Sequence, residues 1–505
     1  MRDNMLYCSL VKKKHLKTNR FCPIVLLLLC VCSLSISAQV VTYLGKYEGV
    51  PLSDRYKVYL RGEKENQNSI VFKNTCNEYI PGTEGNRKND DKPLTKFAGR
   101  TIHWTHFSMK EEVTVELEVA ESLMDKEIRI LPSRFGIQVI KEGEHKIRFT
   151  IEHPGQYSVE IGEEGYKNGL LIFADPLEEE KVKIDSKWQV LERSDKDDIN
   201  RVSKEKKALY FKSGVHDIGV YKIPENIKEI YLEDGAWVYG AFVMEGEDKS
   251  DVKIHGRGVL SGGKLHLRES HSIEAKNGAN RIHIDGIVVC DYVFFAIRLL
   301  GTDNIVDWTK IVGGWIYNCD GIAAYEGSKI RHCFIWANDD NIKVYRDNII
   351  VEDIVCWQLD NGAIIQLNWS NSKARNCVVR NVDVIRAEWD SDRENNGIIS
   401  CRMGGGAHDG FLFENINVDT PVTHMFRLSP KEKDHLISNF KLKNWNVKMN
   451  MSKSKNNYIE GFSPMSKIDG LVFDSFVLNG VKLNKNNFRE EGRFIINNCN
   501  PIVFY

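Results

Sequence analysis

The chain has 505 residues, a formal net charge of −1 and 42% hydrophobic residues. These values are typical of a folded globular protein and argue against a largely disordered chain or a membrane protein with many spans. A dedicated nucleic-acid-binding protein is also unexpected, because such proteins carry a basic stripe or patch. The length predicts two or three domains, or one long repetitive domain.

The first 38 residues have the pattern of an export signal. Six Lys and Arg residues lie between Arg2 and Arg20, and an apolar run over residues 24–32 follows them. This run is too short to span a bilayer as a helix of about 20 residues. Small residues then lead to Ala38, where cleavage is expected. We therefore predict a signal peptide over 1–38, a periplasmic or secreted protein, and no membrane span.

Residues 39–190 are predicted to form an N-terminal domain of β-strands. Apolar and polar side chains alternate over 113–119, which is typical of a strand with one buried face. Two further expected strands, 147–151 and 157–161, flank Pro154-Gly155 and predict a hairpin. No helical period is evident, so a β-sandwich is the expected architecture. The polar stretch 178–207 is the expected linker.

A six-residue template recurs from about residue 215 onward: apolar, any, polar or small, apolar, any, apolar. Its copies begin at residues 284, 330, 351, 379, 413 and 442, with a weaker copy at 308. Each copy is only as long as one strand and cannot bury its apolar side alone, so the copies must stack. Asn381, Asn415 and Asn444 recur at one template position and are expected to stack as turn amides. With no helices between the strands, the template predicts a parallel β-helix over 200–505.

Three acidic residues lie at related places in this repeat. Asp320 precedes Asp339 by 19 residues and Asp340 by 20, and the local coil is about 21–22 residues long. The three carboxylates should therefore occupy neighbouring coils on one outer face, where adjacent strands are ~4.8 Å apart. Because like charges repel, at least one carboxyl is expected to keep its proton at neutral pH.

Such a group of carboxylates suits glycoside hydrolysis. One protonated acid is needed for the leaving oxygen, and one carboxylate activates water. Spacing alone leaves two alternatives open. Three carboxylates also suit a Ca²⁺ ion, and Asn and Asp are common in solvated turns.

The residues around these carboxylates resemble a known catalytic signature. Asn318-Cys319-Asp320-Gly321 followed by residues 338–343, Asn-Asp-Asp-Asn-Ile-Lys, is similar to the motif of glycoside hydrolase family 49. This family contains dextranases and isopullulanases and is related at clan level to the polygalacturonases of family 28. The resemblance implies a β-sandwich followed by a right-handed parallel β-helix, an inverting mechanism and no metal or organic cofactor. It implies that Asp339 is the general acid and that Asp320 and Asp340 position and activate the water.

Two departures from the polygalacturonase pattern bear on the substrate. Cys319 replaces the usual Thr, and its side chain is expected to point inward beside Asp320. No Arg-Ile-Lys follows the Asp pair, although polygalacturonases use it to hold a uronate carboxylate. The second departure argues against a galacturonan substrate.

Polar and aromatic residues near the carboxylates are expected to bind sugar hydroxyls and stack on sugar rings. The candidates are Lys343, Asn318, Asn338, Tyr345, Trp336, Gln366, Asn368, Trp369 and Trp389, with Arg386, Glu388 and Arg402 as weaker ones. Lys343 is expected to pair with a carboxylate or a sugar hydroxyl. A place in the core is the alternative for each Trp.

The sequence and the resemblance together predict an exported inverting hydrolase of a polysaccharide, endo-acting on an α-glucan such as dextran. The polysaccharide is the only partner predicted, and the oligomeric state is left open. One alternative is a β-helix hydrolase or lyase for a sulfated or acidic polysaccharide. Another is a non-catalytic glycan-binding protein, because a fold does not determine a function.

Overall fold

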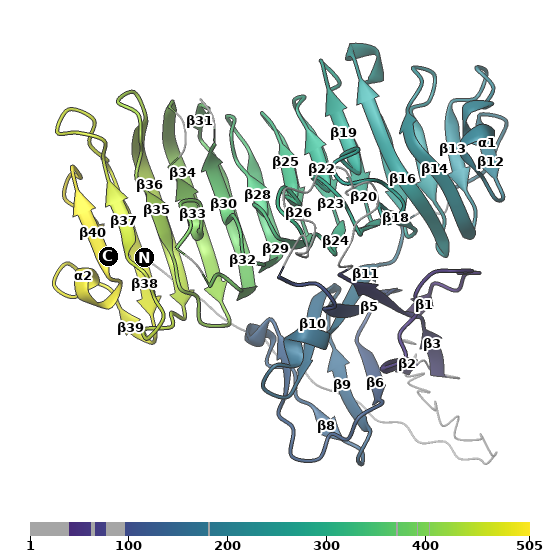
Figure 1. The fold of residues 1–505 in the computed structure, drawn as a ribbon, viewed down its shortest axis with the longest axis horizontal. Helices are drawn as coiled ribbons and strands as arrows, with labels where there is room; N and C mark the ends of the chain where they lie inside the picture. Colours follow the sequence, from purple (N-terminus) through teal and green to yellow (C-terminus); the bar gives the residue numbers. More distant parts are fainter. Residues whose placement is uncertain are drawn as a thin grey trace, which may run out of the picture. The chain divides into compact units, whose positions relative to one another are not determined.

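The computed structural model describes residues 40–61, 66–76, 96–179, 182–369, 372–390, 392–402 and 405–505. Strands dominate this part of the chain (Figure 1). The predicted signal peptide, residues 1–38, lies outside the described residues. Within the described ranges, no helix has the length and apolar character needed to cross a membrane.

Two sheets near the N-terminus pack face to face. One contains β1 (Val40–Thr42), β4 (Val71–Thr75), β5 (Thr101–Met109), β7 (Ile128–Leu131), β10 (Gly155–Ile161) and β11 (Leu170–Pro176). The other contains β2 (Tyr56–Arg61), β3 (Asn66–Ser69), β6 (Val113–Val119), β8 (Ile140–Lys141) and β9 (Lys146–Ile151). Inward residues from both sheets, such as Phe107 and Leu117, form one core. The alternation over 113–119 therefore arises from a strand that buries one face in a β-sandwich.

The hairpin predicted around Pro154-Gly155 is wrong. β9 pairs with β6 and β8 in one sheet, whereas β10 pairs with β7 and β11 in the other. The turn thus carries the chain between the two sheets. Alternation of side chains shows only which face of each strand is buried, and both strands bury theirs in the same core. A hairpin and a crossing between sheets therefore give the same sequence pattern.

A ladder of 30 strands in the described chain runs from β12 (Trp188–Leu191) to β41 (Val503–Phe504), and nearly all its pairs are parallel. The template copies form β20 (His283–Asp285) with β21 (Val288–Cys290), β26 (Lys329–Arg331) with β27 (Phe334–Ala337), β29 (Ile350–Gln358), β32 (Val378–Ala387), β34 (Ala407–Val418) and β36 (Leu436–Val447). The first residues of the last four copies stack in register: Val351 on Val379, then Phe413, then Leu442. The predicted parallel β-helix is confirmed.

The recurring asparagines turn the corners of the helix. Asn381, Asn415 and Asn444 have φ values of 56°, 56° and 54°, in the left-handed region that Asn tolerates better than most residues. The Asn415 amide donates to Asn381 Oδ1 at 2.8 Å, and the Asn444 amide donates to Asn415 Oδ1 at 3.1 Å. These residues form the expected ladder of turn amides.

One face of the β-helix has a regular outward row of side chains. Its strands are β22 (Ile297–Leu299), β25 (Ile322–Ala324), β28 (Ile342–Lys343), β30 (Ala363–Asn368), β33 (Gly397–Cys401), β35 (Phe426–Leu428) and β37 (Asn457–Glu460), which follow one another side by side in Figure 1. Isoleucines stack inward from Ile297 to Ile399. The residues that follow them in the strands stack in the order Arg298, Ala323, Lys343, Gln366, Ser400 and Arg427.

The sandwich packs against the β-helix through aromatic rings and buried charges. Phe173 of β11 lies with its ring centroid 5.2 Å from that of Phe334 in β27. Lys310 Nζ of β24 (Lys310–Val312) lies 2.7 Å from the carboxylate of Asp175 in β11, with both side chains buried. Arg386 pairs with Glu160 and Glu388 pairs with Arg100 of the sandwich. These two weaker candidates therefore hold the two domains together instead of lining the outward row.

Candidate active site

The three acidic residues converge at the start of β25 and β28. Ile322 pairs with Ile342, so Asp320 and Asp340, each two residues earlier, lie beside each other on adjacent coils. The Gly321 amide donates to Asp340 O at 2.9 Å and continues the ladder through this turn. Carboxylate oxygens of Asp320, Asp339 and Asp340 all lie within 4.8 Å of one another, and the three side chains are buried.

Lys343 supplies the positive charge among these carboxylates. Its Nζ lies 2.8 Å from Asp320 Oδ2 and also contacts Asp340 Oδ2. It donates a third hydrogen bond to Gln366 Oε1 at 3.0 Å, and the Tyr345 hydroxyl donates to the same oxygen. Lys343, Tyr345 and Gln366 are therefore gathered around the acidic residues.

Asp339 is held differently, by neutral N–H donors. The Asn318 amide donates to Asp339 Oδ2 at 3.0 Å from a residue with φ of 65°, and the Asp340 amide donates to Oδ1 at 3.1 Å. The Asn361 side chain donates to Oδ2 at 2.7 Å. Asn361 was not among the predicted site residues, although it follows Asp339 by 22 residues, which is the length of one coil.

Burial shifts the protonation of this cluster. Burial raises the pKa of Asp339 to about 6, with a further contribution from the charge of Asp340. Burial also raises the pKa of Asp320 well above its usual range, although Lys343 opposes this shift. Burial alone would lower the pKa of Lys343, but the charges of Asp320 and Asp340 hold that pKa well above its ordinary value. The site therefore combines a permanent ammonium with carboxyls that retain protons toward neutral pH.

Among the residues that the structure describes, two groups of side chains have donors that suit a metal ion. In the acidic group, the Lys343 ammonium already lies between Asp320 and Asp340 and balances their charge, which leaves less reason for a Ca²⁺ ion there. The second group is Cys401, His408 and His435, whose ligand atoms lie within 4.8 Å of one another in the buried interior. His408 Nε2 donates to Leu367 O at 2.8 Å. The other ring nitrogen of His408, Nδ1, lies 3.2 Å from His435 Nε2. Thiolate and imidazole are the ligands that zinc prefers.

Two predicted asparagines bond to the backbone. The Asn338 amide donates to Trp315 O at 2.7 Å, and its oxygen accepts from the Asp360 amide at 3.0 Å. The Asn368 amide donates to Gly405 O at 3.0 Å. Both side chains are buried and are well placed to hold turns beside the acidic residues.

The three predicted tryptophans differ in their surroundings. Trp336 is fully buried and stacks on Trp357 with ring centroids 4.4 Å apart. Trp389 is almost fully buried, and its indole donates to Gly362 O at 2.9 Å. Trp369 is 50% exposed at the end of β30. Of the three, only Trp369 presents an open ring, and Trp336 and Trp389 occupy the alternative place in the core.

Aromatic residues on the other side of Asp320 were not predicted. The Ala296 amide donates to Asp320 O at 2.9 Å, which places Phe295 beside Asp320 on the preceding coil, 5.4 Å from Lys343 Nζ to the ring centroid. His271 stacks on Phe294 with centroids 4.1 Å apart. Phe294 and Phe295 are partly exposed. Their distance from Asp320 of about one coil could have indicated them, but no acidic motif marks that coil.

Comparisons with known proteins agree with this architecture. No family model matches the chain. It is 25% identical over 455 residues to a dextranase of Arthrobacter globiformis, covering 72% of this chain and 70% of that protein. It is 24% identical over 379 residues to an isopullulanase of Aspergillus niger, covering 65% and 64%. The fold matches the structure of Dex49A from Penicillium minioluteum with a TM-score of 0.73 at 17% identity, covering 92% and 96% of the two chains. The predicted resemblance and fold class are confirmed.

Proposed function

We propose that this chain is an exported enzyme that cleaves an α-glucan such as dextran. It is a glycoside hydrolase related to the dextranases and isopullulanases of family 49. Cleavage takes place within the polymer and inverts the anomeric configuration. One observation carries this proposal. Three buried carboxyls lie together, and Lys343 contacts Asp320 and Asp340 while Asp339 accepts only neutral N–H donors. This difference separates the carboxyls into two chemical roles.

Asp339 is the proposed general acid. Lys343 does not contact it, and its charge only partly offsets the effects of burial and of Asp340, so the pKa of about 6 leaves a protonated fraction at mildly acidic to neutral pH. A general acid works best when its pKa lies near the working pH. From the described part of the chain, Oδ1 accepts only the Asp340 amide, so this oxygen can carry the proton toward the glycosidic oxygen.

Asp320 and Asp340 are the proposed pair that positions and activates water. The Lys343 ammonium contacts both and favours the anionic form of Asp320 when Asp339 holds the proton. Because Asp320 and Asp339 interact, their titration belongs to the pair and not to single residues. In sites with two carboxyls, the distance between them predicts the stereochemistry. Because three carboxyls share this site, the proposed inversion rests on the family resemblance instead.

The surroundings support a neutral glycan. Arg298 and Arg427 on the outward row are paired with Glu274 and Asp392, respectively. Their charges are thus compensated by the chain itself, which does not favour the sulfated or acidic polysaccharides of the alternative hypothesis. Gln366, Tyr345 and Lys343 would bind hydroxyls near the bond to be cleaved, Trp369 would stack on a sugar ring, and Asn318, Asn338 and Asn368 would hold the turns around them.

The test is hydrolysis of a panel of polysaccharides by the purified mature protein. Dextran, pullulan, starch, arabinan, polygalacturonate and a sulfated algal glycan are incubated separately, and the reducing ends released are measured beside the Asp339→Asn variant. The proposal predicts release from dextran or another α-glucan and a rapid fall in polymer length, as expected for internal cleavage. Release only from the acidic glycans would contradict the proposed substrate. No release from any glycan would contradict the proposed enzyme.

A further inference from the structure

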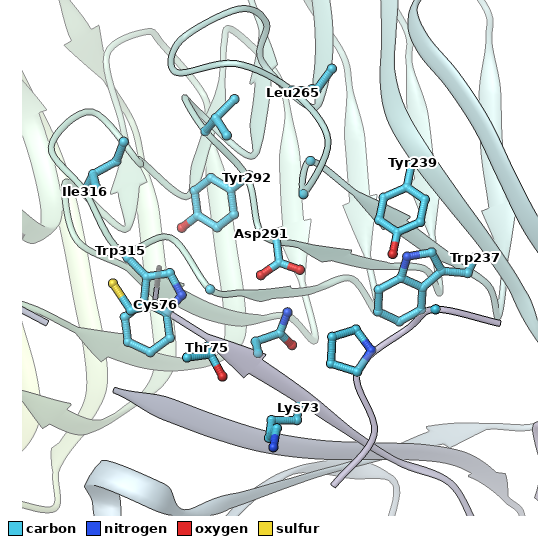
Figure 2. A pocket seen from close by; sticks show the side chains of 17 residues that line it. Lys73, Thr75, Cys76, Trp237, Tyr239, Leu265, Asp291, Tyr292, Trp315 and Ile316 are labelled. Atoms are coloured by element: carbon cyan, nitrogen blue, oxygen red, sulfur yellow. The ribbon is translucent and has the colours of Figure 1, made fainter. Parts of the chain in front are cut away.

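A hollow lies where strand β4 of the sandwich meets the β-helix. It has a volume of about 250 Å³ and is lined by Lys73 and Asn74 of β4 and by Trp237, Tyr239, Asp291 and Trp315 of the helix, among others. Figure 2 shows the Asp291 carboxylate between Trp237 and Tyr239 on one side and Trp315 and Tyr292 on the other. None of these residues belongs to the acidic cluster described above.

The stacking of the coils explains why Asp291 faces open space. Ser261, Cys290 and Val312 pair in register, so the residues that follow them, Gly262, Asp291 and Gly313, lie on successive coils. Glycine on both sides leaves the carboxylate uncovered. Gly313 has φ of 82°, and a Cβ atom added there would lie 3.3 Å from Asp291 Oδ1 and 3.5 Å from Trp315 Nε1.

This empty position lies between an acceptor and a donor. Trp315 is 6% exposed, and its indole N–H has no hydrogen-bond partner among the described residues. The Asp291 carboxylate accepts from the side chains of Asn74 and Cys290, and Ser261 Oγ lies 3.5 Å from its Oδ2. A hydroxyl group at the position kept free by Gly313 could accept from Trp315 and donate to Asp291. A buried donor is costly to leave unpaired, so the pocket is prepared for a polar ligand atom.

The walls suit the other faces of such a ligand. Trp237 and Trp315 contribute apolar ring atoms to the lining, although both side chains are almost fully buried and Trp237 packs on Phe72 of the sandwich. Apolar walls with a few convergent polar groups are typical of small-molecule sites, and this volume lies below the roughly 300–1,000 Å³ of pockets for larger ligands. The combination of apolar ring atoms, one N–H donor and one carboxylate acceptor fits the C–H groups and hydroxyls of a single pyranose ring.

The pocket shares its walls with the turns that carry the acidic residues. The Asn338 amide donates to Trp315 O at 2.7 Å, and the Tyr292 hydroxyl donates to Trp336 O at 2.6 Å. The Cys319 thiol lies 3.1 Å from Tyr292 O. The same turns therefore connect the pocket with Asp320 and Asp339. Because a glycan chain has several sugar rings, one ring could bind in the pocket while another binds at the acidic residues.

We propose that this pocket is an accessory binding site for one sugar ring of the glycan, built jointly by the sandwich and the β-helix, with Asp291 accepting from a hydroxyl and Trp315 donating to one. The proposal rests on the proposed function, because the ring belongs to the polysaccharide that the enzyme cleaves. It adds a role for the sandwich, which contributes Lys73 and Asn74 to the pocket.

The test is calorimetric titration of isomaltotriose and of longer isomaltooligosaccharides into the Asp339→Asn protein, which prevents turnover. Asp291→Asn and Trp315→Phe are each introduced into this protein. Asp291→Asn keeps the shape of the side chain and removes its charge, whereas Trp315→Phe removes the N–H together with one ring of the indole. Asp303→Asn is the matched control, because Asp303 also has a positive φ, of 56°, but is exposed and outside the pocket. Thermal unfolding of each variant shows whether the fold is retained.

The proposal predicts that affinity falls about tenfold in Asp291→Asn, since hydrogen bonds to charged groups are among the stronger ones, and severalfold in Trp315→Phe. Asp303→Asn should bind like its parent. In the active enzyme, the same two changes should raise KM for dextran while kcat stays within about twofold. If the parent enzyme hydrolyses a glycan but Asp291→Asn and Trp315→Phe both bind its oligosaccharides with unchanged affinity, the pocket proposal alone is overturned. Absence of both hydrolysis and binding for every glycan in the panel would overturn the proposed function and the pocket with it.

Discussion

The Nζ atom of Lys343 lies 2.8 Å from Oδ2 of Asp320, and both side chains are almost completely buried. The ammonium also contacts Asp340 but not Asp339. One lysine thus divides three neighbouring carboxyls into a charge-paired couple and a third group that has only neutral donors. This division is the basis for the chemical roles proposed above and for the predictions that follow.

Replacing Asp339 by Asn removes the proposed acid and nearly keeps its shape. We expect kcat on the preferred α-glucan to fall by on the order of 10²–10⁴-fold, because general acid catalysis contributes about this much. Binding of an oligosaccharide, measured by calorimetry, should change little. Asp303→Asn serves as the control and should keep full activity. An Asp339→Asn enzyme with more than a tenth of the parent activity would contradict the assigned role.

The pH dependence of the reaction follows from the raised pKa of Asp339. An acid must be protonated to act, and the pKa of this carboxyl is raised from 3.8 to about 6. Below pH 6 Asp339 holds its proton, and above pH 6 it loses it, so kcat/KM should decline on the alkaline side with an apparent pKa near 6. Initial rates between pH 4 and pH 9 measure this profile. A rate that stays constant up to pH 8 would argue against Asp339 as the acid.

Replacing Lys343 by Met leaves two buried carboxyls without their cation. Breaking a buried ion pair in this way costs about 3–5 kcal/mol of the free energy of unfolding, and we expect that loss at pH 7. The loss should be smaller at pH 4 than at pH 7, because burial favours the neutral form of Asp320 and lower pH favours that form further. Urea unfolding of the parent and the variant at pH 7 and pH 4 measures this loss of the free energy of unfolding.

The control for this change is Lys441→Met, which removes a lysine that pairs with Asp474 at the surface. Exposed pairs contribute only about 0–1 kcal/mol, so this variant should unfold nearly like the parent at both pH values. Equal losses in the two variants, or a loss in Lys343→Met that does not depend on pH, would contradict the assigned charge balance.

The buried pair of Lys310 and Asp175 should hold the sandwich on the β-helix. Lys310 Nζ also donates to Gly286 O at 2.7 Å and to Trp308 O at 2.9 Å, so its removal leaves several groups unpaired. Lys310→Met should therefore destabilise the protein by about 3–5 kcal/mol, and the double change with Asp175→Leu should recover part of this loss. A double-mutant cycle by thermal unfolding measures the coupling. Simple additivity of the two changes would show that the pair is not coupled.

The sequence period was sufficient to predict the fold and the meeting of the three carboxyls. The six-residue template predicted strands and coil length, and a spacing of 20 residues placed Asp340 beside Asp320 because Ile322 and Ile342 pair. The same arithmetic could have indicated Asn361 and Phe295, which lie about one coil away from Asp339 and Asp320, respectively.

Contacts between distant parts of the chain could not be read from the period. Asp175 and Lys310 are 135 residues apart and belong to different domains. Trp336 lies within β27 under the sandwich, where Arg100 is 5.5 Å from its ring centroid, and a cover by another domain has no signal in the repeat. Trp389 follows β32 at a turn, where the side-chain direction no longer alternates. The crossing at Pro154-Gly155 was missed because a hairpin buries the same residues. These three misses concern what packs across the structure, whereas Asn361 and Phe295 repeat along it and were within reach of the period.

The most direct test of the account is the anomer that the enzyme releases first. Proton NMR follows the purified mature protein with the α-glucan it prefers, in the first minutes before the product mutarotates. With Asp339 as acid and a water activated by Asp320 and Asp340, the β-anomer should accumulate first and the α-anomer only later. Initial release of the α-anomer would show retention and would contradict the direct attack of water that the three carboxyls are proposed to support.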